Sequence, residues 1–323
     1  MTSGLTVQVL VTEQDRRRAM EDDIRQGLSS HPRSIPPVWF YDEVGSRLFD
    51  EITRLPEYYL TRAERAILDA RASAIVDAAD ADTLVEIGSG TSEKTLLLLD
   101  AMSAAGRLRH IVLLDISEEV LVEAARRLNE RYRVHVHAVV GDLRSDLDRL
   151  PRLGRQLWAF LGSTIGNFEP RSRAELLSHF HKAMGVEDRL LLGTDLRKDV
   201  ARLLAAYDDA QGVTARFNLN VLNVLNRSLG ADFDPSAFRH CAVWNAEGGW
   251  IEMRLVSTVA QRVTFPSLGM AIDLGAGEEL LTEISSKFER ASLADEFQVA
   301  GLRVLEAWTD PAGDFALTLA GPA

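Results

Sequence analysis

The chain has 323 residues, of which 46% are hydrophobic and 26% are charged, as in ordinary globular proteins. This length is ample for two domains, each with a core of its own. The formal net charge of −12 opposes binding to a phosphate backbone, and no basic patch is concentrated anywhere, so nucleic acid is not an expected partner. The single cysteine, Cys241, excludes an internal disulfide bond and any metal site built from several cysteines.

No apolar run approaches the roughly 18 residues of a membrane span, and residues 1–4 lack the basic and apolar character of a secretory signal. We therefore expect a cytoplasmic protein with no membrane partner. The sequence does not fix the oligomeric state, and a monomer is the working expectation.

The first predicted element is an amphipathic helix over residues 13–28, which have the required apolar spacing and charge density. Three prolines between residues 32 and 37 exclude regular helix there. The next segment, residues 38–61, is rich in aromatic side chains, including Tyr41 and Tyr58. It can form a small aromatic core that fixes the N-terminal arm, or a lid whose tyrosine hydroxyls reach a small polar substrate. Composition favours neither.

A helix predicted over residues 63–79 leads into a short apolar strand, residues 83–87, which breaks at two glycines and passes into a second helix from Ser92. Gly88 and Gly90 let a ligand approach the backbone closely, because no Cβ stands in the way. The start of the following helix offers unpaired N–H groups. The unit therefore predicts a cradle for a nucleotide-like or carboxylate-bearing ligand.

The residues around this turn narrow the choice of ligand. A dinucleotide fingerprint needs glycine where Glu93 stands, and its carboxylate would face a pyrophosphate badly. A phosphate-binding P-loop needs a glycine directly before its lysine, but Glu93 stands directly before Lys94. NAD, FAD and ATP are therefore disfavoured. Glu86 before the G-x-G turn resembles motif I of the class I S-adenosylmethionine (SAM) methyltransferases. The alternative is a tight turn that binds no ligand.

Three further strands are predicted at residues 110–117, 134–140 and 156–162, alternating with helices as in a parallel sheet. The first of them ends in Asp115, whose carboxylate can accept both hydrogen bonds of a ribose diol. The second is followed by Asp142, which could accept the amino group of adenine. Each acid alone is better explained as a helix N-cap, but together with the glycine turn the two acids favour a nucleoside.

Asn167 lies just beyond the fourth strand, where open α/β sheets bring substrate and cofactor together. Its amide can donate to a carboxylate and accept from an amine, which suits a zwitterionic amino acid. The alternative is a turn asparagine that bonds its own backbone. A helix over 171–184 and a fifth strand over 188–196 follow.

The antiparallel pair that would complete such a sheet is predicted only at residues 302–310 and 315–320. About ninety residues separate it from the fifth strand, which exceeds an ordinary loop and predicts an inserted domain. The expected elements of the insert are a helix over 199–212, a helix around 218–226, and strands at 250–259 and 261–265 joined by a tight turn.

Two short patterns in the insert suggest a substrate site. If residues 281–288 are extended, Glu283 and Ser285 share one face, and a carboxylate beside a hydroxyl suits the two nitrogens of an imidazole. A helix-terminal charge with a capping serine explains the pair equally well. Tyr207 is predicted to be a core residue whose hydroxyl can reach a buried partner.

Together these residues resemble the histidine Nα-methyltransferase family of ergothioneine biosynthesis, whose members make the betaine hercynine. The resemblance covers essentially the whole chain, in blocks that follow one order. The blocks are residues 36–42, 45–49, 55–62, 86–94, 162–167, 193–196, 251–253 and 282–288.

This resemblance implies an α/β fold, a class I SAM-methyltransferase Rossmann-like sheet with a discontinuous second, substrate-binding α+β domain. The methyltransferase domain would comprise 62–196 and 288–323, and the substrate domain 10–61 and 197–287. The implied reaction is SAM-dependent trimethylation of the α-amino group of L-histidine. Either Tyr58 or a water molecule would accept the proton.

The resemblance also implies the roles of individual residues. Lys94 would offer its charge to the methionine carboxylate, Asp115 would bind the ribose, and Asp142 the adenine. Glu283 and Ser285 would read the imidazole. The implied cofactor residues are Tyr41, Gly88, Lys94, Asp115, Asp142 and Leu143; the implied substrate residues are Tyr58, Asn167, Tyr207, Met253, Glu283 and Ser285, with Tyr58 and Asn167 catalytic.

Three alternatives compete with this interpretation. The same fold could act on another amino acid, or the protein could be a sensor that binds SAM without turnover. A metal enzyme is the third, because His135 lies near His137, and His179 near His181. No carboxylate ligand accompanies these pairs, so we interpret them as surface or packing residues and expect no metal.

Overall fold

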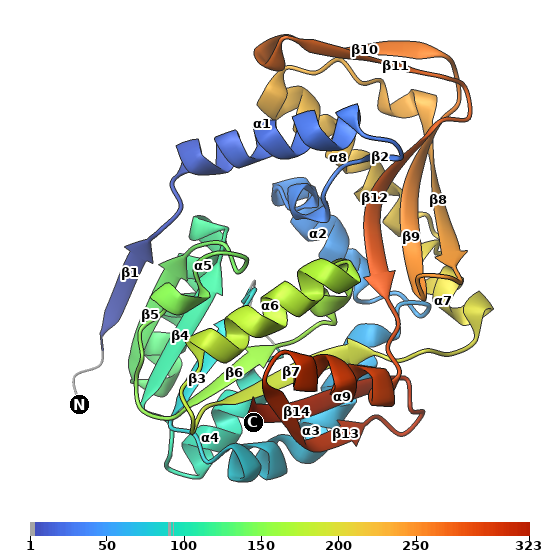
Figure 1. Ribbon diagram of the computed structural model, residues 1–323. Coiled ribbons are helices and arrows are strands. Elements are labelled where there is room, and N and C mark those ends of the chain that lie inside the picture. Colours follow the sequence, from blue (N-terminus) through green and yellow to red (C-terminus); the bar gives the residue numbers. More distant parts are fainter. Residues whose placement is uncertain (1–3, 90–91, 93) are drawn as a thin grey trace. The chain divides into compact units, whose positions relative to one another are not determined.

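The computed structural model describes residues 4–89, 92 and 94–323 (Figure 1). The chain forms two compact units. Unit 1 comprises Met1–Thr12, Arg62–Leu196 and Phe288–Ala323, and unit 2 comprises Glu13–Thr61 and Arg197–Lys287. Among the described residues, none of the helices combines the length and the apolar character that crossing a membrane requires.

Unit 1 is built on an eight-stranded sheet with the order β1-β5-β4-β3-β6-β7-β14-β13. All neighbouring strands from β1 to β7 are parallel, and β14 runs antiparallel to both β7 and β13. This mixed sheet confirms the predicted α/β class. Its strands are β1 Leu5–Val9, β3 Thr83–Ile87, β4 His110–Asp115, β5 His135–Val140, β6 Gln156–Phe160, β7 Arg189–Asp195, β13 Leu302–Thr309 and β14 Phe315–Pro322.

The strand order places a topological switch point between β3 and β6. From β3 the chain proceeds outward through β4 to β5, and it then returns to the other side of β3 with β6 and β7. In open α/β sheets, ligands bind beyond the carboxyl ends of the strands at such a point. The glycines that follow β3 and β6, Gly88 and Gly162, therefore mark the expected binding edge of unit 1.

Helices cover this sheet and supply the rest of its core. Trp158 and Phe160 on β6 are almost fully buried and pack against Phe180, with ring centroids 6.1 and 5.5 Å away. Such aromatic contacts contribute much of the apolar burial that stabilises the sheet. The helices are α3 Leu60–Ala79, α4 Leu96–Ala104, α5 Glu118–Tyr132, α6 Pro170–Ala183 and α9 Arg290–Val299, with 3₁₀ turns η2 Leu147–Arg149 and η3 Thr164–Asn167.

The helix after the glycine turn starts later than the sequence predicts. It was expected from Ser92, but α4 begins at Leu96. Ser92 has a left-handed backbone with φ of +56°. The hydroxyls of Ser92 and Thr95 donate to the Glu86 carboxylate, which holds this connection in a non-helical form. The N–H groups at the start of α4 therefore do not follow the turn directly.

Unit 2 contains a four-stranded sheet in the order β2-β12-β9-β8 and a separate ribbon of β10 and β11. The predicted helices are present, although the one expected over 199–212 already ends at Tyr207. The elements are α1 Glu13–Ser29, β2 Arg33–Ser34, η1 Pro37–Phe40, α2 Glu43–Ile52, α7 Val200–Tyr207, α8 Val213–Leu229, η4 Pro235–Ala237, β8 Phe238–Asn245, β9 Trp250–Ser257, β10 Gln261–Phe265, η5 Pro266–Leu268, β11 Met270–Leu274 and β12 Glu279–Ser286.

The predicted hairpin between residues 250–259 and 261–265 is wrong. Both segments are strands, but β9 pairs with β8 on one side and β12 on the other, whereas β10 pairs with β11. A strand has two edges that can form hydrogen bonds, and both edges of β9 are already used. The turn after Ser257 therefore leads into a different sheet.

The aromatic segment of the N-terminal arm packs inside unit 2. Phe40 is fully buried, with its ring centroid 4.8 Å from that of Phe217 on α8. Tyr58 is buried edge-on against Tyr207, at 6.2 Å, whereas Tyr41 is 43% exposed. The small-core interpretation therefore holds for Phe40, and the binding role of Tyr58 stays a prediction.

Three histidines meet on β4 and β5 of unit 1, near the ends of these strands remote from the binding edge. The rings of His135 and His137 stack at 4.3 Å, and His110 lies 6.2 Å from His137. Burial and the two neighbouring rings lower the pKa of His137 from 6.5 to about 4. Protonation of this imidazole is therefore much less favourable in the folded chain than in the unfolded one.

We expect acid to destabilise unit 1 through His137. Between pH 6.5 and 4 the unfolded chain binds a proton that the folded chain does not, so the free energy of unfolding falls as pH decreases. Because the ring keeps some contact with solvent, the loss is on the order of 1–2 kcal/mol. Urea titrations at pH 7 and pH 4.5 should show a smaller loss for His137→Gln than for the wild type. The exposed His179→Gln is the control, and an equal loss in all three proteins would contradict the prediction.

Candidate functional site

Gly88 forms the turn at the end of β3. Its φ of +68° lies in the left-handed region that favours glycine, and its amide donates to the Leu114 carbonyl at 2.9 Å. Apart from its two chain neighbours, no described residue has an atom within 4 Å of a Cβ built on Gly88. A ligand can therefore come close to this backbone. The predicted close approach at Gly90 and the position of Glu93 lie outside the described residues.

Glu86, the acid before this turn, is buried and holds the turn together. It accepts hydrogen bonds from the hydroxyl of Ser92, at 2.6 Å, and from that of Thr95. Burial raises its pKa to about 7, although these hydrogen bonds and the charge of Lys94 act in the opposite direction. The buried hydroxyl of Ser89 has no hydrogen-bond partner in the described part of the chain. It is thus placed to bond a polar ligand.

Lys94 is held by a carboxylate that the sequence analysis did not identify. Its ammonium group donates to Glu64 on α3 at 2.5 Å, and the other oxygen of Glu64 accepts from the amide of Gly162 at 2.8 Å. Glu64 is fully buried, whereas the Lys94 side chain is 31% exposed. An ammonium group has three N–H donors, so Lys94 can also bind a ligand carboxylate while it keeps its bond to Glu64.

The two acids at the next strand ends lie where the sequence predicts them. Asp115 is half-buried and accepts from the amide of Ser117 at 2.9 Å. Asp142 accepts from the backbone amide of Arg144 at 2.8 Å and pairs with its guanidinium at 2.6 Å. Both carboxylates therefore also cap local turns. An adenine amino group at Asp142 would compete with Arg144, and the half-buried Leu143 lies beside it.

These groups fit SAM. The open backbone at Gly88 provides room, and the Ser89 hydroxyl, which has no partner among the described residues, provides a polar contact. Lys94 supplies a positive charge for a carboxylate. The carboxylates of Asp115 and Asp142 lie at the carboxyl ends of the adjacent strands β4 and β5, as a ribose and a base require.

The predicted substrate residues of unit 2 form a hydrogen-bonded cluster. The hydroxyls of Tyr207 and Ser285 are 2.7 Å apart, and the ammonium group of Lys287 donates to both at 2.8 Å. All three side chains are buried. Lys287 lies in the block 282–288 of the family resemblance, which implies no role for it, and the structure adds it to the site.

Glu283 shares a face of β12 with Ser285. The two residues lie opposite Met253 and Ile251 on β9, and directly opposite residues project to the same side of a sheet. No described residue makes a hydrogen bond to the Glu283 carboxylate. Burial raises its pKa to about 7, and the positive charge of Lys287 opposes this rise. A half-buried carboxylate with a raised pKa and no hydrogen-bond partner among the described residues is suited to binding a polar ligand.

His240 on β8 fixes the backbone of Tyr207. Its Nε2 lies 2.8 Å from the Tyr207 carbonyl, and its Nδ1 lies 2.9 Å from the side-chain amide of Asn218. These partners assign the proton to Nε2, which donates to the carbonyl, while Nδ1 accepts from the amide. Burial lowers the pKa of His240, so the ring is held neutral.

The predicted site residues thus fall into two sets. Asn167, half-buried at the end of η3 after β6, belongs to unit 1 with five of the cofactor residues. Tyr41 belongs to unit 2 with the other substrate residues. No sequence pattern points to Glu64, which resembles a surface charge on a helix, or to Ser89. Unit 1 contains Gly88, Lys94, Asp115, Asp142, Leu143 and Asn167; unit 2 contains Tyr41, Tyr58, Tyr207, Met253, Glu283 and Ser285.

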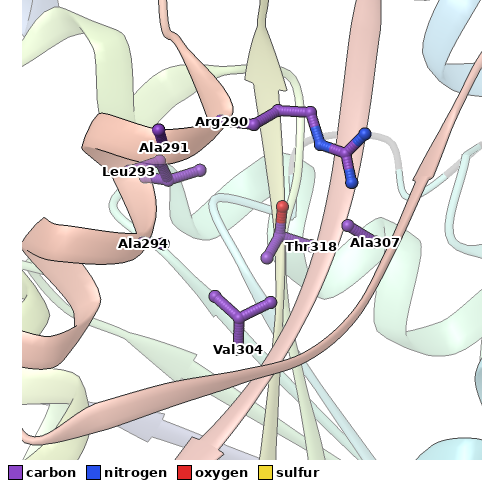
Figure 2. Close-up of a pocket in the computed structure, with 7 residues that line it drawn as sticks. All are labelled: Arg290, Ala291, Leu293, Ala294, Val304, Ala307 and Thr318. Carbon is purple, nitrogen blue, oxygen red and sulfur yellow. The ribbon is translucent and has the colours of Figure 1, made fainter.

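Unit 1 also has a hollow of about 410 Å³, which none of these residues lines. It is bounded by α9, β13 and β14, and β13 is the edge strand, separated from β3 by three others. Arg290 and Thr318 contribute its polar atoms, and Val304 is among its apolar lining residues (Figure 2). It lacks the carboxylates of the strand-end site. In the described ranges, no three histidine, cysteine, aspartate or glutamate side chains are grouped to hold a metal ion.

Comparison with known proteins agrees with this geometry. Residues 20–322 match the family described as "Histidine-specific methyltransferase, SAM-dependent". The chain is 53% identical to the histidine N-alpha-methyltransferase of Mycolicibacterium smegmatis and 52% identical to that of Mycobacterium tuberculosis, in each case over 94% of both chains. It is 30% identical to ergothioneine biosynthesis protein 1 of Neurospora crassa, over 91% of this chain and 34% of that protein. The chain therefore belongs to the family of histidine-specific, SAM-dependent methyltransferases.

Proposed function

We propose that this enzyme transfers three methyl groups in succession from SAM to the α-amino nitrogen of L-histidine and releases hercynine, the first step of ergothioneine biosynthesis. The assignment of histidine as the substrate is based mainly on Glu283. It presents a half-buried carboxylate with no hydrogen-bond partner among the described residues, on the same face of β12 as the Ser285 hydroxyl. A carboxylate and a hydroxyl together match the N–H and the second nitrogen of a neutral imidazole.

The cofactor is assigned to the residues of unit 1, with Tyr41 as a further contact. When bound, SAM supplies the methyl group in electrophilic form on its sulfonium. Gly88 admits the ligand to the backbone, and Lys94 pairs with its carboxylate. Asp115 accepts from the ribose hydroxyls. Asp142 and Leu143 bind the adenine, with Asp142 releasing Arg144 to do so.

The amino-acid backbone of the substrate is assigned to Tyr58, Asn167 and Tyr207. The Asn167 amide donates to the carboxylate and accepts from the amine. Tyr207 is fixed by its bonds to Ser285 and Lys287, so its phenol keeps one position. Met253 packs beside Glu283 and provides an apolar wall for the ring.

The protein needs no strong base for this reaction. The α-amine of a peptide has a pKa of about 8, and that of a free amino acid is somewhat higher because of its carboxylate, so a minor but accessible fraction is neutral and nucleophilic near neutral pH. Tyr58 or a water molecule accepts the proton. The main contribution of the chain is to align the amine with the methyl group, which can supply much of the rate enhancement.

We further assign unit 1 as the SAM-binding domain and unit 2 as the domain that binds the amino acid. A monomer located in the cytoplasm, with no nucleic-acid or membrane partner, is part of the same proposal. The net charge of −12 supports the absence of a nucleic-acid partner, and the lack of an apolar run long enough to span a membrane supports the absence of a membrane partner.

The test is mass spectrometry of the purified protein incubated with methyl-labelled SAM and an equimolar mixture of the common amino acids. We expect trimethylhistidine with three labelled methyl groups as the dominant product. Label on a different amino acid would retain the methyltransferase assignment but contradict the imidazole role of Glu283 and Ser285. Absence of label from every amino acid would favour a sensor that binds SAM without turnover.

A further inference from the structure

Lys287 is a buried ammonium group directly after β12. It is 6% exposed, donates to Tyr207 and Ser285 at 2.8 Å each, and lies 4.5 Å from the centre of the Tyr207 ring. Burying an ammonium group is costly unless hydrogen bonds and negative charge compensate it. Its position between the two substrate-binding hydroxyls therefore requires an explanation.

We propose that Lys287 is a positioning residue for histidine recognition: its ammonium group fixes the hydroxyls of Tyr207 and Ser285 and supplies the positive charge that faces Glu283. The inference depends on the proposed function, because it explains how the residues assigned to histidine are kept in their binding state.

The number of donors and acceptors in the cluster supports this role. Lys287 is a donor only, so both hydroxyl oxygens act as acceptors toward it. The contact between Tyr207 and Ser285 uses one of their two hydroxyl protons. The second proton must therefore be donated to an acceptor outside this triangle. A carboxylate or an unprotonated ring nitrogen of the substrate is such an acceptor.

Lys287 is also the charged group that acts on Glu283 in the described part of unit 2. Its positive charge favours the carboxylate form and opposes the effect of burial. The other groups on this side of the sheet are neutral, paired elsewhere or largely exposed to solvent. They are the phenols of Tyr58 and Tyr207, the neutral ring of His240, the amide of Asn218, Asp208, whose side chain is 54% exposed, Asp209, which caps α8, and Arg197, which lies over the Trp244 ring.

The combined effect is selection of one form of the substrate. A carboxylate at Glu283 accepts the ring N–H, and a hydroxyl proton is donated to the other ring nitrogen. That pattern fits neutral imidazole in a single tautomer. If Glu283 were protonated, only its uncharged carbonyl oxygen could accept the ring N–H, and the hydrogen bond would lose its charge assistance, so histidine would bind more weakly.

The experiment compares Lys287→Gln with Lys287→Arg. Glutamine is neutral and still donates hydrogen bonds, whereas arginine keeps the charge. We expect KM for histidine to rise about 10- to 100-fold in Lys287→Gln, because charge-assisted hydrogen bonds are lost, with a much smaller change in kcat. The dissociation constant of SAM should be unchanged, which also verifies that each variant is folded.

The pH profile distinguishes positioning from a purely structural role. The ratio of wild-type to variant kcat/KM removes the titration of histidine itself. Without the positive charge of Lys287, the pKa of Glu283 should rise by about one unit. For Lys287→Gln we therefore expect this ratio to fall about fivefold between pH 7 and pH 9. For Lys287→Arg the ratio should be independent of pH.

A pH-independent ratio for Lys287→Gln would overturn the inference, and so would a pH-dependent ratio for Lys287→Arg. If Lys287→Gln does not bind SAM, Lys287→Met replaces it in the comparison. A pH-dependent ratio for Lys287→Arg overturns the inference in either case. A wild-type enzyme that does not methylate histidine would instead overturn the proposed function. The two failures are therefore distinguishable.

Discussion

Replacing Asn167 with alanine is expected to lower kcat/KM for histidine by about 100-fold or more while SAM binding is retained. The proposed role gives its amide two hydrogen bonds to charged or polar groups of the substrate, each contributing about 1.5–3 kcal/mol when one partner is charged. The residue follows β6 at the switch-point edge of unit 1, where a substrate is expected. Steady-state kinetics and calorimetric titration with SAM measure the two effects separately.

The matched variant is Asn167→Asp. Asparagine and aspartate serve similarly in turns, so a purely structural Asn167 would tolerate this change. An aspartate in the proposed role would instead repel the substrate carboxylate and could not donate to it. We expect Asn167→Asp to be as inactive as Asn167→Ala. Near-normal turnover by the aspartate variant would remove Asn167 from the mechanism.

The second large effect is expected at Glu64, where alanine should lower the free energy of unfolding by roughly 3 kcal/mol and weaken SAM binding about tenfold or more. The fully buried carboxylate accepts from both Lys94 and the Gly162 amide. Its removal leaves an amide without a partner and an ammonium group without its counter-charge. Lys94 would then turn toward solvent and away from the cofactor. Urea denaturation and SAM titration measure the two losses.

A double substitution tests the reason for this loss. Lys94→Met alone leaves the carboxylate of Glu64 buried without its counter-charge, so it should be at least as destabilising as Glu64→Ala. Because the double variant removes both charges, its stability should exceed that expected from adding the two single losses. SAM binding should not recover with it. Strictly additive stability losses would show that the two residues are not energetically coupled.

Most of the sheet of unit 1 could be predicted from sequence because its strands are buried apolar runs. The residues of β3 and β6 are all buried, and they alternate in the chain with helices. The edge strand β1 carries no such signal. Four of its five residues are exposed, and it is held by pairing with β5. Its existence depends on a partner more than 120 residues away, which local patterns cannot reveal.

The candidate site divides in the same way. Gly88, Asp115 and Asp142 could be inferred because strand ends and turns determine their positions locally. Glu64 and Lys287 could not, because their importance comes from partners that are distant in the chain or depend on the fold. A glutamate on a charged helix is usually on the surface, and only the packing of α3 shows that this one is fully buried.

The order in which the chain contributes strands to its two larger sheets affects how it folds during synthesis. In unit 2, β2 pairs with β12, although nearly 250 residues separate them, and β12 also completes β9. In unit 1, β14 is inserted between β7 and β13. At typical translation rates, β12 is synthesised roughly 12–50 s after β2. Until β12 is made, one edge of β9 is unpaired, and one edge of β7 is unpaired until β14 is made. The nascent chain therefore carries unpaired strand edges through most of its synthesis, which makes the yield of folded enzyme sensitive to translation speed and to the supply of chaperones.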